Sequence, residues 1–331
     1  MRKRRWHPGV WAGGVILFMG FMGGITLGCN ERVKGAGAAT SAPTDWSRSV
    51  ALLNEGYIYD LFPLGKENVW AAGAFGKIFH YDGKEWKPSP VPSQYKDFHL
   101  FDLFFTSPDN GWAVGEDMVI PKKQGVMFHY DGKGWSQVDN PSNDSLTSIH
   151  FTSPENGWAV GASSNLLHFN GTTWEKVQPP RFCYLSRVFF TSPENGWAVG
   201  NEGVILHYDG TAWSVATSPT KEHLYGLHFS SAQEGWAVGD MGTILHYQGG
   251  AWTLTSSPTD LTLFSVYFRS PQKGYAVGSA GTVLRYRGGK WEELKDNPTP
   301  HFLYAVAYEN PLGLLVAGRE KMIFNNPKVK E

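Results

Sequence analysis

Cysteine is scarce in this sequence, which has only Cys29 and Cys183 among its 331 residues. Cys29 lies in a motif that points to lipid attachment, as argued below, so Cys183 is left without a partner. An intrachain disulfide is therefore not expected to support the fold, even in an oxidising compartment. Most of the stability must come from the burial of apolar side chains.

Charge is scarce as well. Only 18% of the residues are charged and the formal net charge is −1, so the chain lacks the basic field that holds phosphate backbones, and nucleic acid is not an expected partner. The sequence contains no Gly-rich phosphate loop and no HExxH or CxxC motif, and we expect neither a metal nor a cofactor. Aromatic residues are abundant instead, with 14 Trp, 20 Phe and 14 Tyr. This composition indicates an ordered globular chain.

The N-terminus has the pattern of an export signal. Basic residues at 2–5 precede an uncharged, Gly-rich apolar run over 10–28, and small residues lead into Cys29. This pattern predicts a signal peptide over residues 1–28. The sequence ITLGC resembles the lipobox of bacterial lipoproteins, with Thr26 at the position where leucine is usual. The resemblance implies that signal peptidase cuts before Cys29 and that its thiol carries lipid.

Residues 29–44 are rich in Gly, Ala, Ser and Thr and are predicted to form a flexible, lipid-attached linker. The alternative is an uncleaved N-terminal helix, because the nineteen apolar residues at 10–28 are just long enough to span a bilayer. In both cases we expect the rest of the chain outside the cytoplasm. It would be tethered to a membrane of the bacterial envelope, in the periplasm or at the cell surface.

An internal repeat dominates the remainder of the sequence. FTSPENGWAVG occurs at 151–161 and 190–200, with close variants at 105–115, 229–239 and 268–278. The central aromatic residue recurs at intervals of 39 to 46 residues, and LLVAG supplies a degenerate seventh copy. The residues at this position are Trp70, Trp112, Trp158, Trp197, Trp236, Tyr275 and Leu315.

Each repeat has the pattern of four short strands, which we call a to d. In the fourth repeat, an apolar run at 185–190 is strand a, Trp-Ala-Val at 197–199 is strand b, and 204–208 is strand c. Asp209-Gly210 then forms a two-residue hairpin, and Trp213 begins strand d. Units of about forty residues with four strands are typical of propeller blades. The sequence therefore predicts an all-β, seven-bladed β-propeller of four-stranded antiparallel blades.

The strand-d tryptophan predicts how the ring closes. It occurs six times after the first strand b, at Trp86, Trp135, Trp174, Trp213, Trp252 and Trp291. The last repeat ends without a strand d, whereas Trp46 precedes Trp70 at the usual spacing. We therefore expect the N-terminal strand to complete the last blade, giving a closed propeller over residues 45–328 without exposed edge strands. We expect the tryptophans to pack between neighbouring blades; a carbohydrate platform would require them at irregular loop positions.

The repeats resemble those of BNR/Asp-box propellers, and especially the photosystem II assembly factor family, whose units also have a GWAVG-like strand followed by a hairpin that ends in tryptophan. The resemblance covers nearly all of 45–328. The repeats depart from the full Asp-box motif, because Asp209 stands only four residues before Trp213 and follows His207-Tyr208. The resemblance implies a lumenal or periplasmic factor that binds a partner protein.

Two patterns suggest chemistry. Five histidines share one strand-c position, at His80, His129, His168, His207 and His246. Metal ligands lie about 2 Å from zinc, so residues on separate blades cannot share an ion, and we expect these histidines to bond within their own blades. A sialidase-like glycosidase needs an arginine cluster and an acid pair. Arg181, Arg187 and Arg319 could reach one face, but the sequence shows no accompanying acid pair, and we expect no enzymatic activity.

The candidate site is predicted by comparing the seven repeats at fixed distances before the strand-b aromatic residue. The residue twelve positions before this aromatic is apolar in every repeat, as packing demands, whereas the residues eleven and thirteen positions before it vary between blades. The residues ten positions before it are mostly small or polar, which suits side chains that face a central channel. Insertions often carry binding specificity, and about seven extra residues within 116–124 of the second repeat fall on the same face. The predicted partner-binding residues are Tyr57, Tyr59, Asp60, His99, Phe101, Asp102, Tyr184, Arg187, His223, Tyr225, Phe264, Phe302 and Tyr304.

We call the face formed by the d-to-a and b-to-c connections the connection face. The sequence favours a membrane-tethered binding or scaffold protein that recognises another envelope protein there, with the propeller itself monomeric. The alternative is a glycan or small-ligand binding module, which a single deep pocket would favour over a broad shallow face. The predicted aromatic residues could also simply plug the channel mouth, because aromatic side chains are often buried.

Overall fold

The computed structural model describes residues 46–51, 56–65, 67–95, 97–118, 124–310, 312–319 and 322–328. The predicted signal peptide at 1–28, the lipid site at Cys29 and the linker at 29–44 lie outside these described residues. Residues 43–331 form one compact unit. In its described part, no helix is long and apolar enough to cross a membrane.

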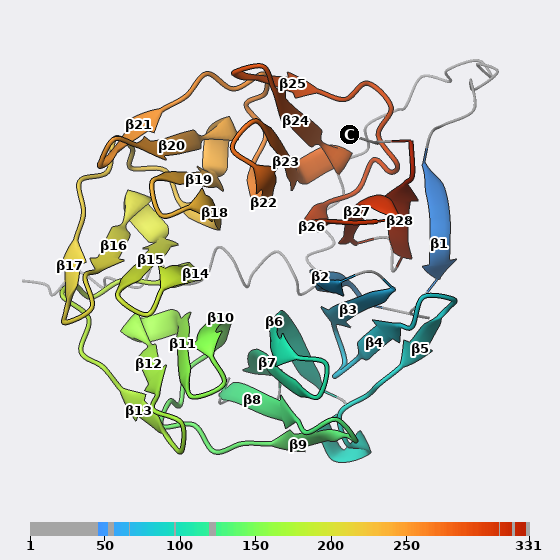
Figure 1. Cartoon of the computed structure of the whole chain (residues 1–331), viewed down its shortest axis with the longest axis vertical. Coiled ribbons are helices and arrows are strands. Elements are labelled where there is room, and N and C mark those ends of the chain that lie inside the picture. The colour runs from blue at the N-terminus through green and yellow to red at the C-terminus, as the bar shows by residue number, and fades with distance from the viewer. Residues whose placement is uncertain are drawn as a thin grey trace, which may run out of the picture. The chain divides into compact units, whose positions relative to one another are not determined.

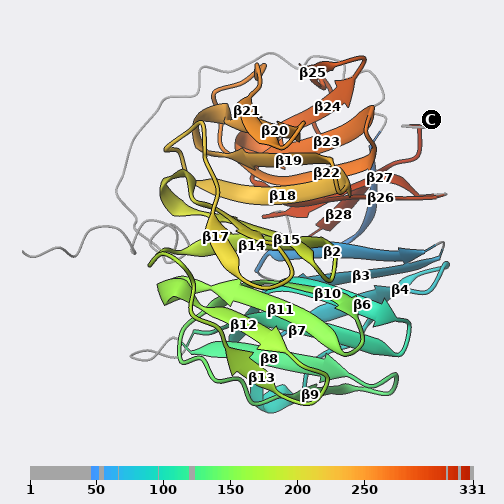
Figure 2. The ribbon, with the colours of Figure 1, turned by 60° about the vertical axis from the view of Figure 1, so that its left-hand side comes forward.

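Seven four-stranded antiparallel sheets are arranged as blades around a central axis, as predicted. Figure 2 shows the strands of neighbouring blades running side by side across the thickness of the ring. Blades one to three comprise β2 (Ile58–Gly65), β3 (Asn68–Gly73), β4 (Ile78–Tyr81), β5 (Trp86–Pro88); β6 (Phe98–Ser107), β7 (Asn110–Asp117), β8 (Gly125–Tyr130), β9 (Trp135–Gln137); and β10 (Leu146–Ser153), β11 (Asn156–Gly161), β12 (Leu166–Phe169), β13 (Trp174–Lys176).

Blades four to six follow the same order. They comprise β14 (Leu185–Ser192), β15 (Asn195–Gly200), β16 (Ile205–Tyr208), β17 (Trp213–Val215); β18 (Leu224–Ser231), β19 (Glu234–Gly239), β20 (Ile244–Gln248), β21 (Ala251–Leu254); and β22 (Leu263–Ser270), β23 (Lys273–Gly278), β24 (Val283–Arg287), β25 (Lys290–Glu293). Short 3-10 turns occur at η1 (Ser93–Tyr95), η2 (Ala162–Ser164), η3 (Asn201–Gly203), η4 (Asp240–Gly242) and η5 (Ser279–Gly281).

Blade seven joins the two ends of the propeller. It consists of β26 (Leu303–Glu309), β27 (Gly313–Gly318), β28 (Met322–Asn326) and the N-terminal strand β1 (Ser47–Ala51), which pairs antiparallel with β28. Trp46 is only 8% exposed and packs with residues of blades six and seven. Its indole Nε1 donates a hydrogen bond of 2.6 Å to the carbonyl of Asp296. The predicted closure of the ring is therefore confirmed.

Aromatic side chains hold the blades together. All tryptophans of the described residues are buried, and each strand-d tryptophan packs against strand b of the preceding blade. The ring centroids of Trp70 and Trp135 are 6.1 Å apart, and those of Trp236 and Trp291 are 5.5 Å apart. Their edge-to-face orientation is the arrangement that aromatic pairs prefer. This interblade packing is what the repeat predicts, and it leaves no tryptophan platform for carbohydrate among these residues.

The strand-c histidines bond within their own blades, as expected. Each Nε2 lies 2.6–2.9 Å from a side-chain oxygen at the start of strand b, and each ring packs on the strand-b tryptophan with centroids 4.0–4.5 Å apart. The pairs are His80–Asn68, His129–Asn110, His168–Asn156, His207–Asn195 and His246–Glu234. Within the described residues, no group of three or more histidine, cysteine or acidic side chains could hold a metal.

In blades two to six, a glycine precedes the strand-b aromatic residue, and it has a steric cause. A Cβ at Gly196 would lie 2.3 Å from the ring of Phe190, and the same clash occurs at Gly157 with Phe151. The aromatic ring of strand a covers the backbone of strand b at this point, and only glycine leaves room for it.

Candidate partner-binding site

A β-bulge shapes strand a at the connection face in every blade. In blade one, Ile58 pairs with Gly73 and Asp60 with Ala72, so that Tyr59 is an extra residue without a partner of its own. The same irregularity occurs in the other six blades. A bulge re-aims a side chain and bends the strand. It places the residue eleven before the strand-b aromatic at the mouth of the channel.

Nine of the predicted residues form one continuous group of rings around this mouth, which we call the aromatic arc. Neighbouring ring centroids in the arc are 5.2–6.5 Å apart. In spatial order from blade two through blades one, seven and six to blade five, the arc consists of His99, Phe101, Tyr59, Tyr57, Tyr304, Phe302, Phe264, Tyr225 and His223. Blades three and four interrupt it, with Thr147 and Ser186 at the bulge.

The members of the arc differ in accessibility. Tyr59 and His99 are buried, and the Tyr59 hydroxyl and His99 Nδ1 share a hydrogen bond of 3.0 Å. For these two residues the burial fits the channel-plug alternative. The other seven side chains are half-buried. Tyr225 donates a hydrogen bond of 2.9 Å to the carboxylate of Asp240, which fixes the orientation of its ring. Among the described residues, Tyr184 makes no ring contact with the arc.

Four large apolar side chains on the surrounding connections are exposed, and the sequence reasoning missed them. Phe182 is 82% exposed and Met241 is 67% exposed; Phe75 and Leu261 are also exposed. Phe75 and Met241 have positive φ angles of 61° and 52°, in b-to-c turns where such a backbone is uncommon for residues other than glycine. All four lie on d-to-a or b-to-c connections, and therefore on the connection face.

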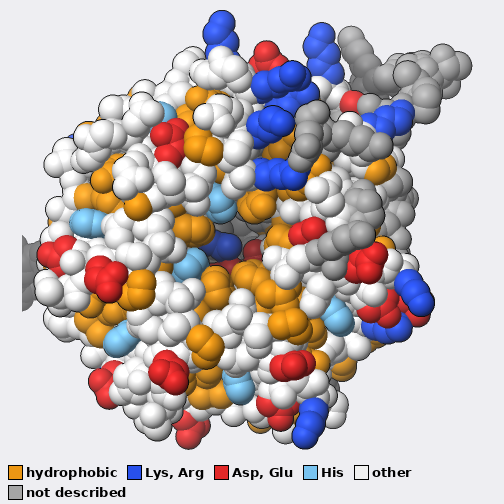
Figure 3. Space-filling model, viewed as in Figure 1, with side chains coloured by type: hydrophobic (Ala, Val, Ile, Leu, Met, Phe, Trp, Pro, Cys, Tyr) orange, Lys and Arg blue, Asp and Glu red, His pale blue; other side chains and the backbone are white. Residues whose placement is uncertain are grey.

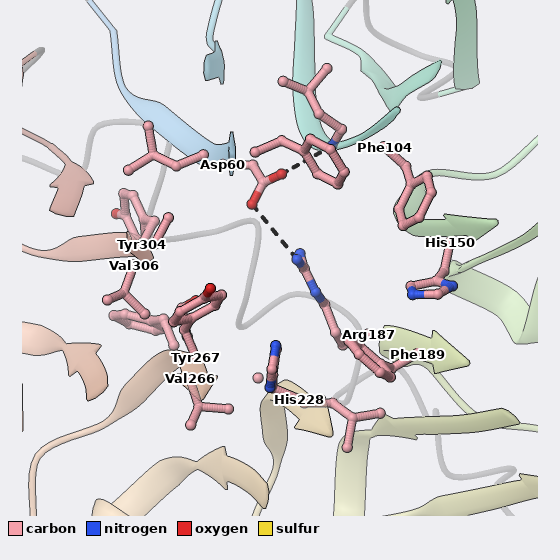
Figure 4. Close-up of a pocket in the computed structure, with 18 of the residues that line it drawn as sticks. Asp60, Phe104, His150, Arg187, Phe189, His228, Val266, Tyr267, Tyr304 and Val306 are labelled. Carbon is pink, nitrogen blue, oxygen red and sulfur yellow. Dashed lines mark hydrogen bonds and ion pairs between the residues drawn. The ribbon is translucent and has the colours of Figure 1, made fainter. Parts of the chain in front are cut away.

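Three further predicted residues meet inside the channel, and we call them the charged triad. Arg187 reaches across from β14 toward Asp60 on β2 (Figure 4). Its guanidinium nitrogens lie 2.8 Å from Asp102 Oδ1 and 3.7 Å from Asp60 Oδ1. The expectation that no acid pair accompanies the arginines is therefore wrong for Arg187. Arg181 pairs with Glu202 at the surface, and Arg319 lies over the ring of Tyr57, so the three arginines do not form one cluster.

Both carboxylates of the triad also tie neighbouring blades together. Asp60 Oδ2 accepts a hydrogen bond of 3.1 Å from the amide of Leu103, and Asp102 Oδ2 accepts one of 2.8 Å from the amide of Ile149. Burial, together with the charge of Asp102, raises the pKa of the Asp60 carboxyl. Because a second buried carboxylate nearby opposes ionisation, the uncharged form of Asp60 is favoured beside the guanidinium.

The predicted insertion in blade two lies at the connection between β7 and β8. Glu116 pairs with Gly125 and is buried. Its charge contributes to raising the pKa of Tyr59, after the larger effect of burial. Residues 119–123 of the insertion lie outside the described part of the chain.

The fold and these surfaces define a closed, BNR-like repeat propeller with an aromatic connection face. Residues 128–215 match the family model described as photosynthesis system II assembly factor YCF48. The chain is thus similar to the family that the repeat suggested. No protein in a search of curated proteins matches it.

Solved structures show the same fold. A structure described as YCF48 bound to D1 peptide has 18% sequence identity and a TM-score of 0.69, covering 89% of this chain and 99% of that chain. YCF48 from Cyanidioschyzon merolae has 15% identity and a TM-score of 0.67, covering 86% and 99%. The WD40 repeats of RRP9 have 10% identity and a TM-score of 0.68, covering 86% and 97%.

Proposed function

We propose that this protein is a membrane-tethered, extracytoplasmic binding or scaffold protein, and that its connection face recognises a partner protein of the bacterial envelope. The observation that carries the proposal is the aromatic arc, whose half-buried rings continue over five blades and are surrounded by exposed apolar side chains. Aromatic residues and methionine are enriched at protein interfaces. The arc lies at the beginnings of the inner strands and on the connections before them, where a rigid scaffold holds binding residues in place.

The ring orientations favour a protein segment over a glycan. Tyr57 and Phe101 meet Tyr59 at interplanar angles of 75° and 72°, so these rings do not form one flat platform. Apolar side chains of a partner can pack against the edges of such rings. One of the similar structures, YCF48, is described as bound to a peptide, which supports recognition of a protein segment by this fold.

Replacing Tyr225, Phe264 or Tyr304 singly with Ala is expected to weaken capture of the envelope partner about thirtyfold for a central residue, because such an anchor contributes about 2 kcal/mol. The measurement is crosslinked pull-down from the native envelope, compared with the melting temperature of each variant. Leu254→Ala is the matched control, because Leu254 is 63% exposed on the outer strand β21. Stable variants that capture the partner as well as the unmodified protein would place the site elsewhere.

Membrane tethering is expected to depend on Cys29. Two or three acyl chains on this residue would contribute about 0.8 kcal/mol per buried methylene, enough for persistent attachment. Cys29→Ser should abolish incorporation of labelled palmitate and block maturation, and Cys183→Ser should change neither. Equal palmitate incorporation with and without Cys29 would contradict the lipobox assignment and favour the uncleaved helix.

A further inference from the structure

The central channel contains a cavity beside the charged triad. Its volume is about 240 Å³, and it is lined by successive residues of the inner strands, such as Asp60 to Pro63 of β2. Figure 3 shows a hollow at the centre of the ring with basic, acidic and histidine side chains around it. Phe264 and Tyr304 of the aromatic arc also line the cavity.

Six aromatic side chains form the wall of this cavity, and we call them the aromatic belt. Each occupies the strand-a position eight residues before the strand-b aromatic, and consecutive ring centroids are 4.6–5.1 Å apart. The belt consists of Phe62, Phe104, His150, Phe189, His228 and Tyr267. Blade seven has Ala307 at this position, which leaves one gap in the belt. The belt is thus aromatic in six of the seven blades, and Asp60, Arg187 and Ser265 add polar groups beside it.

His228 supplies a hydrogen-bond donor to the cavity. Its Nδ1 accepts a hydrogen bond of 3.3 Å from the amide of Phe268, so in the neutral ring Nε2 carries the proton. Figure 4 shows the ring pointing toward the middle of the cavity. His150 lies on the opposite side of Phe189, and its Nδ1 has no hydrogen-bond partner among the described residues.

The cavity has polar groups but little net charge. Burial, with the nearby charge of Arg187, lowers the pKa of His228 and of His150 to about 3, so both rings are neutral at pH 7. The guanidinium of Arg187 is balanced by Asp102. An anionic ligand would lose its hydration without finding a free counter-ion, and a cation would face Arg187.

The volume limits the size of an occupant. An apolar cavity of about 150 Å³ can hold benzene, and pockets for drug-sized ligands begin near 300 Å³. The channel cavity, at about 240 Å³, fits one aromatic ring with a short substituent. We propose that the aromatic belt and His228 form a binding site for an uncharged single-ring aromatic compound whose substituent carries a hydrogen-bond acceptor such as a carbonyl.

Three probes of similar shape test this site on the full-length chain. Acetophenone has the ring and the carbonyl, ethylbenzene lacks the acceptor, and benzoate carries a charge. By isothermal titration calorimetry, we expect saturable one-to-one binding of acetophenone. Ethylbenzene should bind about three- to tenfold more weakly, the effect of one hydrogen bond, and benzoate at least about tenfold more weakly because of its charge.

Two variants locate the site. Ala307→Phe completes the belt and fills the cavity, so it should weaken acetophenone binding more than about tenfold while partner capture is retained. His228→Phe keeps a ring but removes the donor, so acetophenone and ethylbenzene should bind equally. No acetophenone binding at millimolar concentration, tighter binding of benzoate, or unchanged binding to a folded Ala307→Phe variant would overturn the proposal. If both variants fail to fold, the difference between acetophenone and ethylbenzene on the unmodified chain decides.

Discussion

Deletion of residues 43–50 is expected to lower the melting temperature markedly and to make the protein associate through blade seven. The deletion removes Trp46 and most of β1, which leaves β28 as an open edge strand. A buried tryptophan removes about 150–250 Å² from water, which corresponds to an upper bound of about 4–6 kcal/mol. Thermal unfolding and size-exclusion chromatography would measure the two effects.

Deletion of residues 35–42 is the matched control, because it shortens the chain by the same length without touching β1. It should leave both the melting temperature and the elution volume unchanged. Trp46→Ala alone should reproduce most of the stability loss, about 3–5 kcal/mol, without opening the edge. A monomeric 43–50 deletion with unchanged melting would contradict the role assigned to the N-terminal strand.

The second large effect is expected at the charged triad. Arg187→Met should lower the free energy of unfolding by about 3 kcal/mol, because it leaves two buried carboxylates without a cation. This stability loss is at the lower end of the range for breaking a buried ion pair, because the Arg187 side chain is 33% exposed. Asp102→Asn should be more harmful than Asp60→Asn, since the raised pKa of Asp60 already favours its uncharged form. Denaturant unfolding of the three variants gives the comparison.

The pH dependence provides an independent check of the triad. The pKa of Asp60 is raised in the folded state, so its stabilising contribution is present at low pH and is lost as the pH rises through that pKa. The pKa of Asp60 is raised to about 8, so Asp60→Asn should lose less stability than the unmodified protein as the pH rises from about 4 to about 8. The uncharged triple variant Asp60→Asn, Asp102→Asn, Arg187→Met should recover part of the loss seen in Arg187→Met. Arg187→Met with unchanged stability would contradict this account.

The repeat made the blades and the ring closure predictable. The period, the Asp-Gly hairpins and the missing seventh strand d are all visible along the sequence. Together they indicate one arrangement of the strands. The spacing of Trp46 before Trp70 was sufficient to predict that β1 completes blade seven. The strand-c histidines were also predictable, because equivalent residues on separate blades cannot converge on one ion.

The β-bulge could have been predicted but was missed. Leu100 and Leu103 are both buried in one core cluster although they are three residues apart. A regular strand would turn one of them to the opposite face, because its side chains alternate. The same spacing of apolar residues recurs in all seven repeats, for example at Leu224 and Leu227, and it indicates one extra residue between them.

The sequence placed the members of the charged triad at the channel, because all three occupy the strand-a position ten residues before the strand-b aromatic. The repeat pattern could not show that their side chains touch across the channel. They meet because the channel is narrow and the side chain of Arg187 is long enough to cross it. The exposure of Met241 also depends on the left-handed backbone of its b-to-c turn. The sequence of this turn, DMG, resembles those of the other b-to-c connections and does not by itself indicate an exposed side chain.

Site-specific photocrosslinking tests the proposed binding face most directly. A photoreactive residue would replace Met241 on the connection face or Leu254 on the outer strand β21. The native side chains at these two positions are almost equally exposed, at 67% and 63%. In the native envelope, we predict that Met241 and Phe182 crosslink to the same partner protein and that Leu254 does not. Equal crosslinking from all three positions, or crosslinking from Leu254 alone, would contradict recognition at the connection face.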